Sequence, residues 1–145
     1  MLIERDELCL LIPHGNRMCL LDEVLFWNEE TIICGTLTHV DPDNPLRTSS
    51  GLSSLHAIEY GAQAMAIHGG LIARDMGKAL QTAYLAGLRQ VTLSVDWLND
   101  YNMSLTVEAK RLFSIGDSLI YEFYVKADDD LLVQGRITVI GGIGG

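Results

Sequence analysis

The sequence has few basic residues, few prolines and no long apolar run. Its 10 Lys and Arg stand against 19 Asp and Glu, which gives a formal net charge of −9, and the basic residues are scattered. Because a nucleic-acid partner requires a basic surface for its phosphates, we expect none. No apolar run approaches the roughly 18 residues that span a bilayer, so we expect no membrane segment either.

The amino terminus and the cysteines indicate the cellular compartment in which we expect the protein. Residues 1–7 carry acidic and basic side chains and lack the apolar segment of a secretory signal. The three cysteines, Cys9, Cys19 and Cys34, are odd in number and lack metal-ligand spacing, which favours reduced thiols in a cytoplasmic protein. The chain has no Gly-x-Ser-x-Gly elbow and no phosphate loop. We expect neither a metal nor a cofactor.

The length of 145 residues and the 48% apolar content suit a single globular domain over residues 1–145. Strands are expected at 23–27 and 31–40, before a loop that begins at Asp41. A proline-free helical period then covers about 53–76, with Ser53 or Ser54 as its cap.

The remainder of the chain alternates with a period of two, as a sheet with one buried face requires. Four strands are expected, at 88–97, 103–113, 119–126 and 131–140. The glycine-rich residues 141–145 are expected to form a flexible tail. Two strands, one long helix and four strands in an antiparallel meander predict an α+β fold whose sheet curls around the helix.

The helix at 53–76 has apolar side chains on two faces. Between these faces runs a narrow polar strip of His56, Glu59, Gln63 and Arg74. A helix that is apolar around most of its circumference is covered on more than one side. A carboxylate on it must then be paired, hold a proton or act at a site. The alternative is that the strip faces water through a gap in the sheet.

Two separated motifs resemble those of one enzyme family. The first has the Pro-His-x-x-x-x-x-Leu-x-Asp spacing of bacterial (FabZ-like) 3-hydroxyacyl-acyl-carrier-protein dehydratases, and its matching residues are Pro13, His14, Leu20 and Asp22. Residues 57–63, Ala-Ile-Glu-Tyr-Gly-Ala-Gln, resemble the Glu-Ala-Met-Ala-Gln helix of that family. Residues 84–89, Tyr-Leu-Ala-Gly-Leu-Arg, resemble its ApeP-like branch, predicted dehydratases found with aryl-polyene pigment genes. The likeness covers nearly the whole chain.

The resemblance implies a hotdog fold, an antiparallel sheet wrapped around one long central helix, and a hydro-lyase activity. His14 would be the base at C2 of the acyl chain, and Glu59 the acid that protonates the leaving 3-hydroxyl. An imidazole is poised near neutral pH, and a carboxyl in an apolar tunnel can hold a proton. Amide groups at Ser54 and Leu55 would polarise the thioester carbonyl, with Gln63 also beside the substrate.

The resemblance also implies partners. The substrate would be an acyl-carrier-protein or acyl-CoA thioester in fatty-acid or polyene-type biosynthesis. His14 of one protomer would face Glu59 of the other in a homodimer, or in a heterodimer with a second hotdog chain, and a higher oligomer is an open alternative. An acidic carrier protein needs a local basic patch, for which the candidates are Arg17, Arg74, Lys78 and Arg89.

Two other functions stay open. A hotdog acyl thioesterase would use Glu59 to activate water instead of protonating a hydroxyl. A non-catalytic chain would bind a carrier protein or pair with an active dehydratase. The second alternative arises because Ser53-Ser54 replaces the Pro-Gly that the family usually has at the start of the helix.

Overall fold

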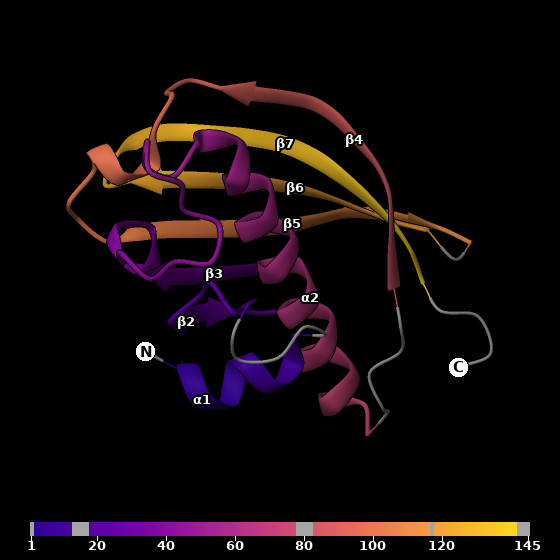
Figure 1. Ribbon diagram of the computed structural model, residues 1–145. Coiled ribbons are helices and arrows are strands. Elements are labelled where there is room, and N and C mark those ends of the chain that lie inside the picture. Colours follow the sequence, from indigo (N-terminus) through magenta and orange to yellow (C-terminus); the bar gives the residue numbers. More distant parts are fainter. Residues whose placement is uncertain (1, 13–17, 78–82, 117, 142–145) are drawn as a thin grey trace.

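The structure is a computed structural model that describes residues 2–12, 18–77, 83–116 and 118–141. Within these ranges, seven strands form one antiparallel sheet in the order β1-β2-β3-β5-β6-β7-β4. The sheet curves over one long helix, α2, and the short helix α1 lies below β2 near the amino terminus (Figure 1). This is the α+β architecture that the sequence predicts.

The two α-helices divide the strands along the chain: β1 precedes α1, β2 and β3 lie between α1 and α2, and the other four strands follow α2. The bounds are β1 Ile3–Glu4, β2 Glu23–Trp27, β3 Thr31–Thr36, β4 Ala83–Leu93, β5 Leu105–Ile115, β6 Ser118–Ala127 and β7 Asp130–Gly141. In the β2–β3 turn, the side-chain oxygen of Asn28 accepts from the amides of Glu30 and Thr31 at 2.9 and 2.8 Å. An Asn side chain that bonds the backbone just after it is a common turn device.

Helix α2 spans Ala57–Asp75 and follows a 3₁₀ turn at Ser54–His56. The hydroxyl of Ser53 accepts from the amide of Leu55 at 3.2 Å, so Ser53 caps this turn. One apolar face of α2 packs on the sheet, with Tyr60, Ile67 and Leu71 in the core. The other face, which includes Ile58, Ala62, Ala66 and Ile72, is only partly covered within this chain.

Strand β4 differs from the expected strand in both bounds and place. It covers Ala83–Leu93 instead of 88–97, and its pairing with β7 shifts register between Leu85 and Gly87 and again between Arg89 and Thr92. The expected meander is wrong at this point: β4 pairs with β7 at the far edge of the sheet, whereas β5 pairs with β3. The first 3₁₀ turn after β3, at Thr38–Val40, likewise replaces the end of the expected strand 31–40.

The two ends of the chain contain elements that periodicity missed. Helix α1 spans only Arg5–Leu8, too few residues to show a helical period. At the other end, Gly141 closes β7 opposite Ala83, so the strand includes the first residue of the expected tail. Residues 142–145 lie outside the described part.

Two cysteines correct the expectation of reduced thiols. Cys9 and Cys19 form a disulfide, with both side chains buried. Cys34 is a free, buried thiol on β3, and burial raises its pKa to about 12. An odd count of three could not indicate this pairing, because it does not identify which cysteines meet in space.

Candidate active site

The centre of the candidate site is the pair Glu59 and Gln63, one turn apart on α2. Gln63 is 2% exposed, whereas Glu59 is half-buried. The Nε2 of Gln63 donates to Oε1 of Glu59 at 3.2 Å and to the carbonyl of Met18 at 2.6 Å. Its Oε1 accepts from the amide of Leu20 at 2.8 Å. At Gln63 the polar strip is therefore not a solvated face, because this glutamine ties the helix to residues 18–20, whereas Arg74 at the end of the strip is exposed.

The amide of Gln63 has one orientation in this arrangement. The amide of Leu20 is a donor, so the group that faces it must be the side-chain oxygen of Gln63. Both Nε2 hydrogens then have acceptors, in Met18 and Glu59. A fully satisfied buried amide holds its neighbours in a defined geometry. One oxygen of the Glu59 carboxylate is thereby oriented.

A second buried network supports the same turn of α2. The hydroxyls of Thr36 and Thr38 both donate to the carbonyl of Leu20, each at 2.6 Å. The Thr38 hydroxyl also lies 2.8 Å from that of Tyr60, which accepts from the side-chain Nδ2 of Asn44 at 3.0 Å. Burial raises the pKa of Tyr60 to about 12, so this hydroxyl keeps its proton.

Sequence reasoning missed this network. It placed Tyr60 on an apolar face and ended the strand beyond Thr38. A usable signal was present, because a buried Tyr hydroxyl requires a hydrogen-bond partner. The sequence could not indicate which residue supplies that partner, since Thr38 and Asn44 belong to a loop before the helix.

The expected base, His14, lies outside the described residues, together with Pro13 and Arg17. The residues that flank this segment are described. Ile12 is part of the core, and Met18 is bound by Gln63. The chain therefore enters and leaves the 13–17 segment at fixed positions, and its exit lies beside Glu59.

The backbone amides expected to bind the thioester carbonyl already have acceptors within the chain. The amide of Ser54 donates to the carbonyl of Asp96 at 2.9 Å. That of Leu55 donates to the Ser53 hydroxyl at 3.2 Å. A backbone carbonyl is fixed, whereas a serine hydroxyl can rotate away. Leu55 is thus the more accessible donor of the two, and its side chain is exposed.

Two further histidines, His39 and His68, are buried and form hydrogen bonds within the core. His39 Nε2 lies 2.7 Å from the carbonyl of Tyr101. The ring of His68 lies between the carbonyl of Asn28 and the hydroxyl of Tyr121, at 2.7 Å from each. Burial lowers the pKa of both histidines. No group of three metal-ligating side chains occurs among the described residues.

The expected basic patch is described only in part, because Arg17 and Lys78 lie outside the described residues. Arg74, in the last turn of α2, pairs with Glu7 at 3.4 Å, and both side chains are about half exposed. Arg89 is exposed on β4, opposite Arg136 of β7. Across the described ranges, no helix is long and apolar enough to cross a membrane.

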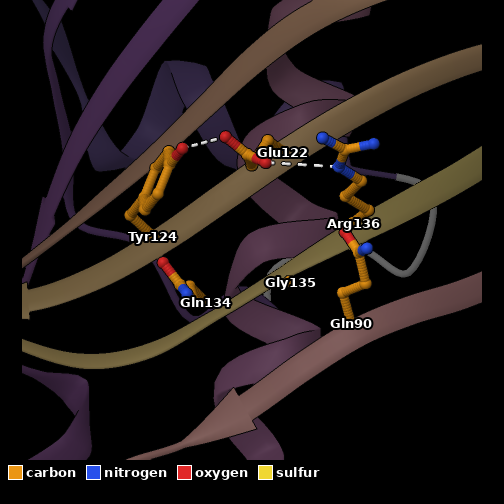
Figure 2. Close-up of a pocket in the computed structure, with 6 residues that line it drawn as sticks. All are labelled: Gln90, Glu122, Tyr124, Gln134, Gly135 and Arg136. Carbon is orange, nitrogen blue, oxygen red and sulfur yellow. Dashed lines mark hydrogen bonds and ion pairs between the residues drawn. The ribbon is translucent and has the colours of Figure 1, made fainter.

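A pocket of about 130 Å³ lies elsewhere, on the face of the sheet turned away from α2 (Figure 2). Its lining comes from β4, β6 and β7. Glu122 in this pocket accepts from Arg136 at 3.3 Å and also from the Tyr124 hydroxyl. Neither Glu59 nor Gln63 lines this pocket. Its charged groups neutralise each other on an outer sheet face.

The architecture is that of the hotdog fold, with a sheet wrapped around a single long helix. Among solved structures, this chain is similar to a chain of the dehydratase heterocomplex ApeI:P from Xenorhabdus doucetiae. The TM-score is 0.84 and the identity 22%, with coverage of 99% of this chain and 94% of that one. It is also similar to a variant of a thioesterase from Pseudomonas aeruginosa, with a TM-score of 0.69, 10% identity, and coverage of 98% and 96%. A variant thioesterase from Staphylococcus aureus subsp. aureus Mu50 has a TM-score of 0.64, 12% identity, and coverage of 83% and 92%. At these identities the likeness defines the fold alone.

The sequence profile of one family, described as "ApeP-like: ApeP dehydratase", matches residues 7–142. The chain therefore belongs to the ApeP-like dehydratase family. A search of curated proteins found no match.

Proposed function

We propose that this chain dehydrates 3-hydroxyacyl thioesters to trans-2-enoyl thioesters, with Glu59 as acid and His14 as base. The observation that carries the proposal is the Gln63 bridge, which orients Glu59 beside the exit of the 13–17 segment. A half-buried carboxylate held in this way suits proton transfer at a defined point better than a freely solvated one. Membership in a dehydratase family supports the reaction class.

The reaction needs one acceptor and one donor of protons. His14 would remove a proton from C2 while the protonated Glu59 donates one to the 3-hydroxyl, which leaves as water. The C2–H and C3–O bonds break and the C2–C3 double bond forms. The histidine ends with one more proton and the glutamate with one fewer, so a proton must return to Glu59 before the next turnover.

The thioester carbonyl would be bound at the start of α2. There the Leu55 amide and the positive end of the helix favour an oxygen that gains negative charge. The carbonyl would take the place of the Ser53 hydroxyl, which now accepts from this amide. Ser54 and Gln63 would border the same substrate.

We further propose that the working unit contains a second hotdog chain. Within one chain, the α2 face that includes Ile58 and Ala62 is only partly covered. Leu85, Leu88 and Leu93 of β4 are 57%, 41% and 43% exposed. This strand is also an edge with unpaired backbone groups, a surface that proteins normally cover. The partner would be a second copy or a different hotdog chain, and the Xenorhabdus doucetiae heterocomplex supports the latter.

The carrier of the acyl group would be an acyl carrier protein, with CoA as the alternative. With a net charge of −9, this chain would repel an acidic carrier except at a local basic surface. Arg89 is exposed and would serve in that role, and Arg74 is exposed but already pairs with Glu7. A carrier-protein substrate would be used with a lower KM than the matching CoA thioester, and added salt would reduce that difference.

The test is enoyl formation from 3-hydroxyacyl thioesters, measured with the purified chain alone and mixed with a partner hotdog chain. We expect Glu59→Gln and His14→Ala each to lower kcat by about 10² or more. Glu108→Gln, at a half-buried glutamate on β5, serves as the matched control and should retain the wild-type rate.

Three other results would contradict the proposed function, and each points to a different conclusion. Unchanged rates in both site variants would overturn the proposed roles. Release of free thiol without enoyl product would identify a thioesterase. Activity that appears only with the partner chain, and survives both site variants, would identify this chain as non-catalytic.

A further inference from the structure

The short helix α1 contributes one side chain that reaches residues 19–22, the segment that precedes β2. Arg5 donates from one terminal nitrogen to the carbonyl of Cys19 at 2.7 Å. From the other it donates to the carbonyl of Leu21 at 3.0 Å and to Oδ1 of Asp22 at 2.9 Å. All three acceptors belong to residues 19–22. One guanidinium thus spans the segment that begins at the Gln63 bridge.

Residues 18–22 are held from two sides by this arrangement. In an extended segment, neighbouring residues face opposite directions. Cys19 and Leu21 direct their carbonyls to Arg5, whereas Met18 and Leu20 present a carbonyl and an amide to Gln63. Because the segment is continuous, a shift on the Arg5 side moves the groups that orient Gln63, and Gln63 in turn orients Glu59.

The carboxylate of Asp22 connects Arg5 to Leu37, the residue directly after β3. Its Oδ1 accepts from Arg5, and its Oδ2 accepts from the amide of Leu37 at 2.7 Å. Both oxygens are therefore used, and the planar fork of an arginine matches such a set of acceptors better than the point charge of a lysine. The disulfide between Cys9 and Cys19 attaches the same segment to the residues that follow α1.

We propose that Arg5 is a positioning residue: it holds residues 18–22 against Gln63 and so keeps Glu59 in its working orientation. The effect on catalysis rests on the proposed function, whereas the effect on the segment does not. Arg5 does not contact Glu59 in the structure, so it acts through the backbone of residues 19–21 and the side chain of Gln63. Its side chain is 40% exposed and that of Asp22 36%. Pairs with this exposure contribute little to folding, so Arg5→Gln should leave a folded protein.

The first experiment measures amide hydrogen exchange by NMR in the full chain. The reporter is the amide of Leu20, whose acceptor is Oε1 of Gln63. We expect Arg5→Gln to speed its exchange by about tenfold or more, with the amides of β6 unchanged. Arg5→Lys, which keeps the charge but not the fork, should show a smaller increase. It also provides a second test should Arg5→Gln not fold.

Glu7→Gln is the matched control for this experiment. Glu7 lies on the same short helix and pairs with Arg74, not with residues 18–22. We expect Leu20 to exchange in this variant as in the wild type. Equal protection of Leu20 in the wild type, Arg5→Gln and Arg5→Lys would overturn the proposal, whatever the chain catalyses.

The second experiment is a double-mutant cycle on kcat with Arg5→Gln and Gln63→Met. Residues that act through one segment give non-additive effects, whereas independent structural losses add. We expect Arg5→Gln to lower kcat by about tenfold with KM nearly constant, and to lower it little further when Gln63 is already replaced. Faster exchange with an unchanged kcat would overturn the catalytic part alone. A wild type inactive on every thioester would instead count against the proposed function. The exchange result would still test whether Arg5 holds residues 18–22 against Gln63.

Discussion

Gln63 and Glu59 are joined by a hydrogen bond of 3.2 Å across one turn of α2, and the same glutamine nitrogen donates to Met18 at 2.6 Å. The glutamine is therefore shared between the helix and the amino-terminal segment. Its neutral amide is the group best suited to this place, because it offers a donor to two oxygens and an acceptor to one N–H at the same time.

Replacement of Gln63 should reveal both roles. Gln63→Met keeps the approximate volume but leaves the amide of Leu20 and the carbonyl of Met18 without partners. We expect a loss of about 2 to 4 kcal/mol of unfolding free energy, measured by urea denaturation. Gln134→Met, at a half-buried position of β7 whose side chain makes no hydrogen bond within the described residues, should change stability by less than about 0.5 kcal/mol.

A titratable replacement of Gln63 should make the stability of the protein depend more strongly on pH. In Gln63→Glu the introduced carboxyl can donate to Met18 only when protonated, and when ionised it repels Glu59. We expect this variant to be less destabilised at pH 5 than at pH 8, relative to the wild type at each pH. Equal destabilisation at both values would contradict the hydrogen-bond assignment of this amide.

Ser53 should compete with substrate for the Leu55 amide. Ser53→Gly removes the hydroxyl that now accepts from this amide, and a glycine cap costs only a few tenths of a kcal/mol relative to serine. We expect a lower KM for the thioester with nearly unchanged stability, measured by steady-state kinetics and thermal unfolding. Ser49→Gly, on the exposed loop before the helix, is the control and should leave KM unchanged.

The thiols should respond to reagents in three distinct steps. Cys34 is buried and has a pKa raised to about 12, so it should not react with a thiol reagent in the native protein. Unfolding without reductant should expose one thiol, and unfolding with reductant three, because Cys9 and Cys19 are paired. The disulfide should stabilise the fold by roughly 2 to 3 kcal/mol through its short loop. Three reactive thiols without reductant would contradict the pairing.

The sequence predicts those parts of the fold that depend on local periodicity. The long helix has this character because its apolar residues recur with a helical period, and β6 has it because buried residues alternate along the strand. Strand β4 does not, since its bulge and its edge position are set by pairing with β7, which lies about fifty residues later in the chain. The place of a strand in a sheet follows from long-range contacts that alternation alone cannot encode.

The candidate site divides in the same way. Glu59 and Gln63 belong to one helix turn, so their spacing already places them on one side of it. The partners of Gln63 do not follow from spacing: Met18 and Leu20 bond its side chain because residues 18–20 lie against α2. Such contacts between separate elements require the tertiary structure.

Two glycines of α2 should respond to alanine in opposite ways. A Cβ at Gly61 would lie 2.7 Å from the ring of Phe123, so Gly61→Ala forces the helix away from β6. We expect a loss of about 1 to 3 kcal/mol in unfolding free energy. A Cβ at Gly69 would meet no atom within 4 Å, so Gly69→Ala should add up to about 1 kcal/mol from helix propensity. Similar effects of the two variants would contradict the close approach of α2 to Phe123.

The pH dependence of stability should depend in part on His68. Its Nε2 must donate to the Asn28 carbonyl, so Nδ1 accepts from the Tyr121 hydroxyl and the folded protein holds the neutral ring. Burial lowers the pKa of His68, the hydrogen bond that its ring donates to the Asn28 carbonyl raises it, and the nearby Arg111 guanidinium on β5 lowers it.

The sign of the effect follows from proton uptake. As the pH falls below the ordinary histidine pKa of about 6.5, the unfolded chain binds a proton that the folded protein does not, so stability decreases. The contribution of His68 is complete above pH 6.5 and is lost as the pH falls toward the lowered folded pKa. We expect His68→Gln to be less stable at pH 7.5 but to lose less stability between pH 7 and 5.5, measured by urea unfolding at each pH.

Tyr121→Phe separates the hydrogen bond from the titration. This variant removes the hydroxyl that donates to His68 Nδ1 but leaves the ring buried beside Arg111, so we expect a loss of about 1 kcal/mol with the pH slope retained. His39, whose pKa burial also lowers, should supply the slope that remains in His68→Gln. A wild-type slope in His68→Gln would mean that the ring takes up its proton in the folded state as readily as in the unfolded chain, which the fully buried position between Asn28 and Tyr121 argues against.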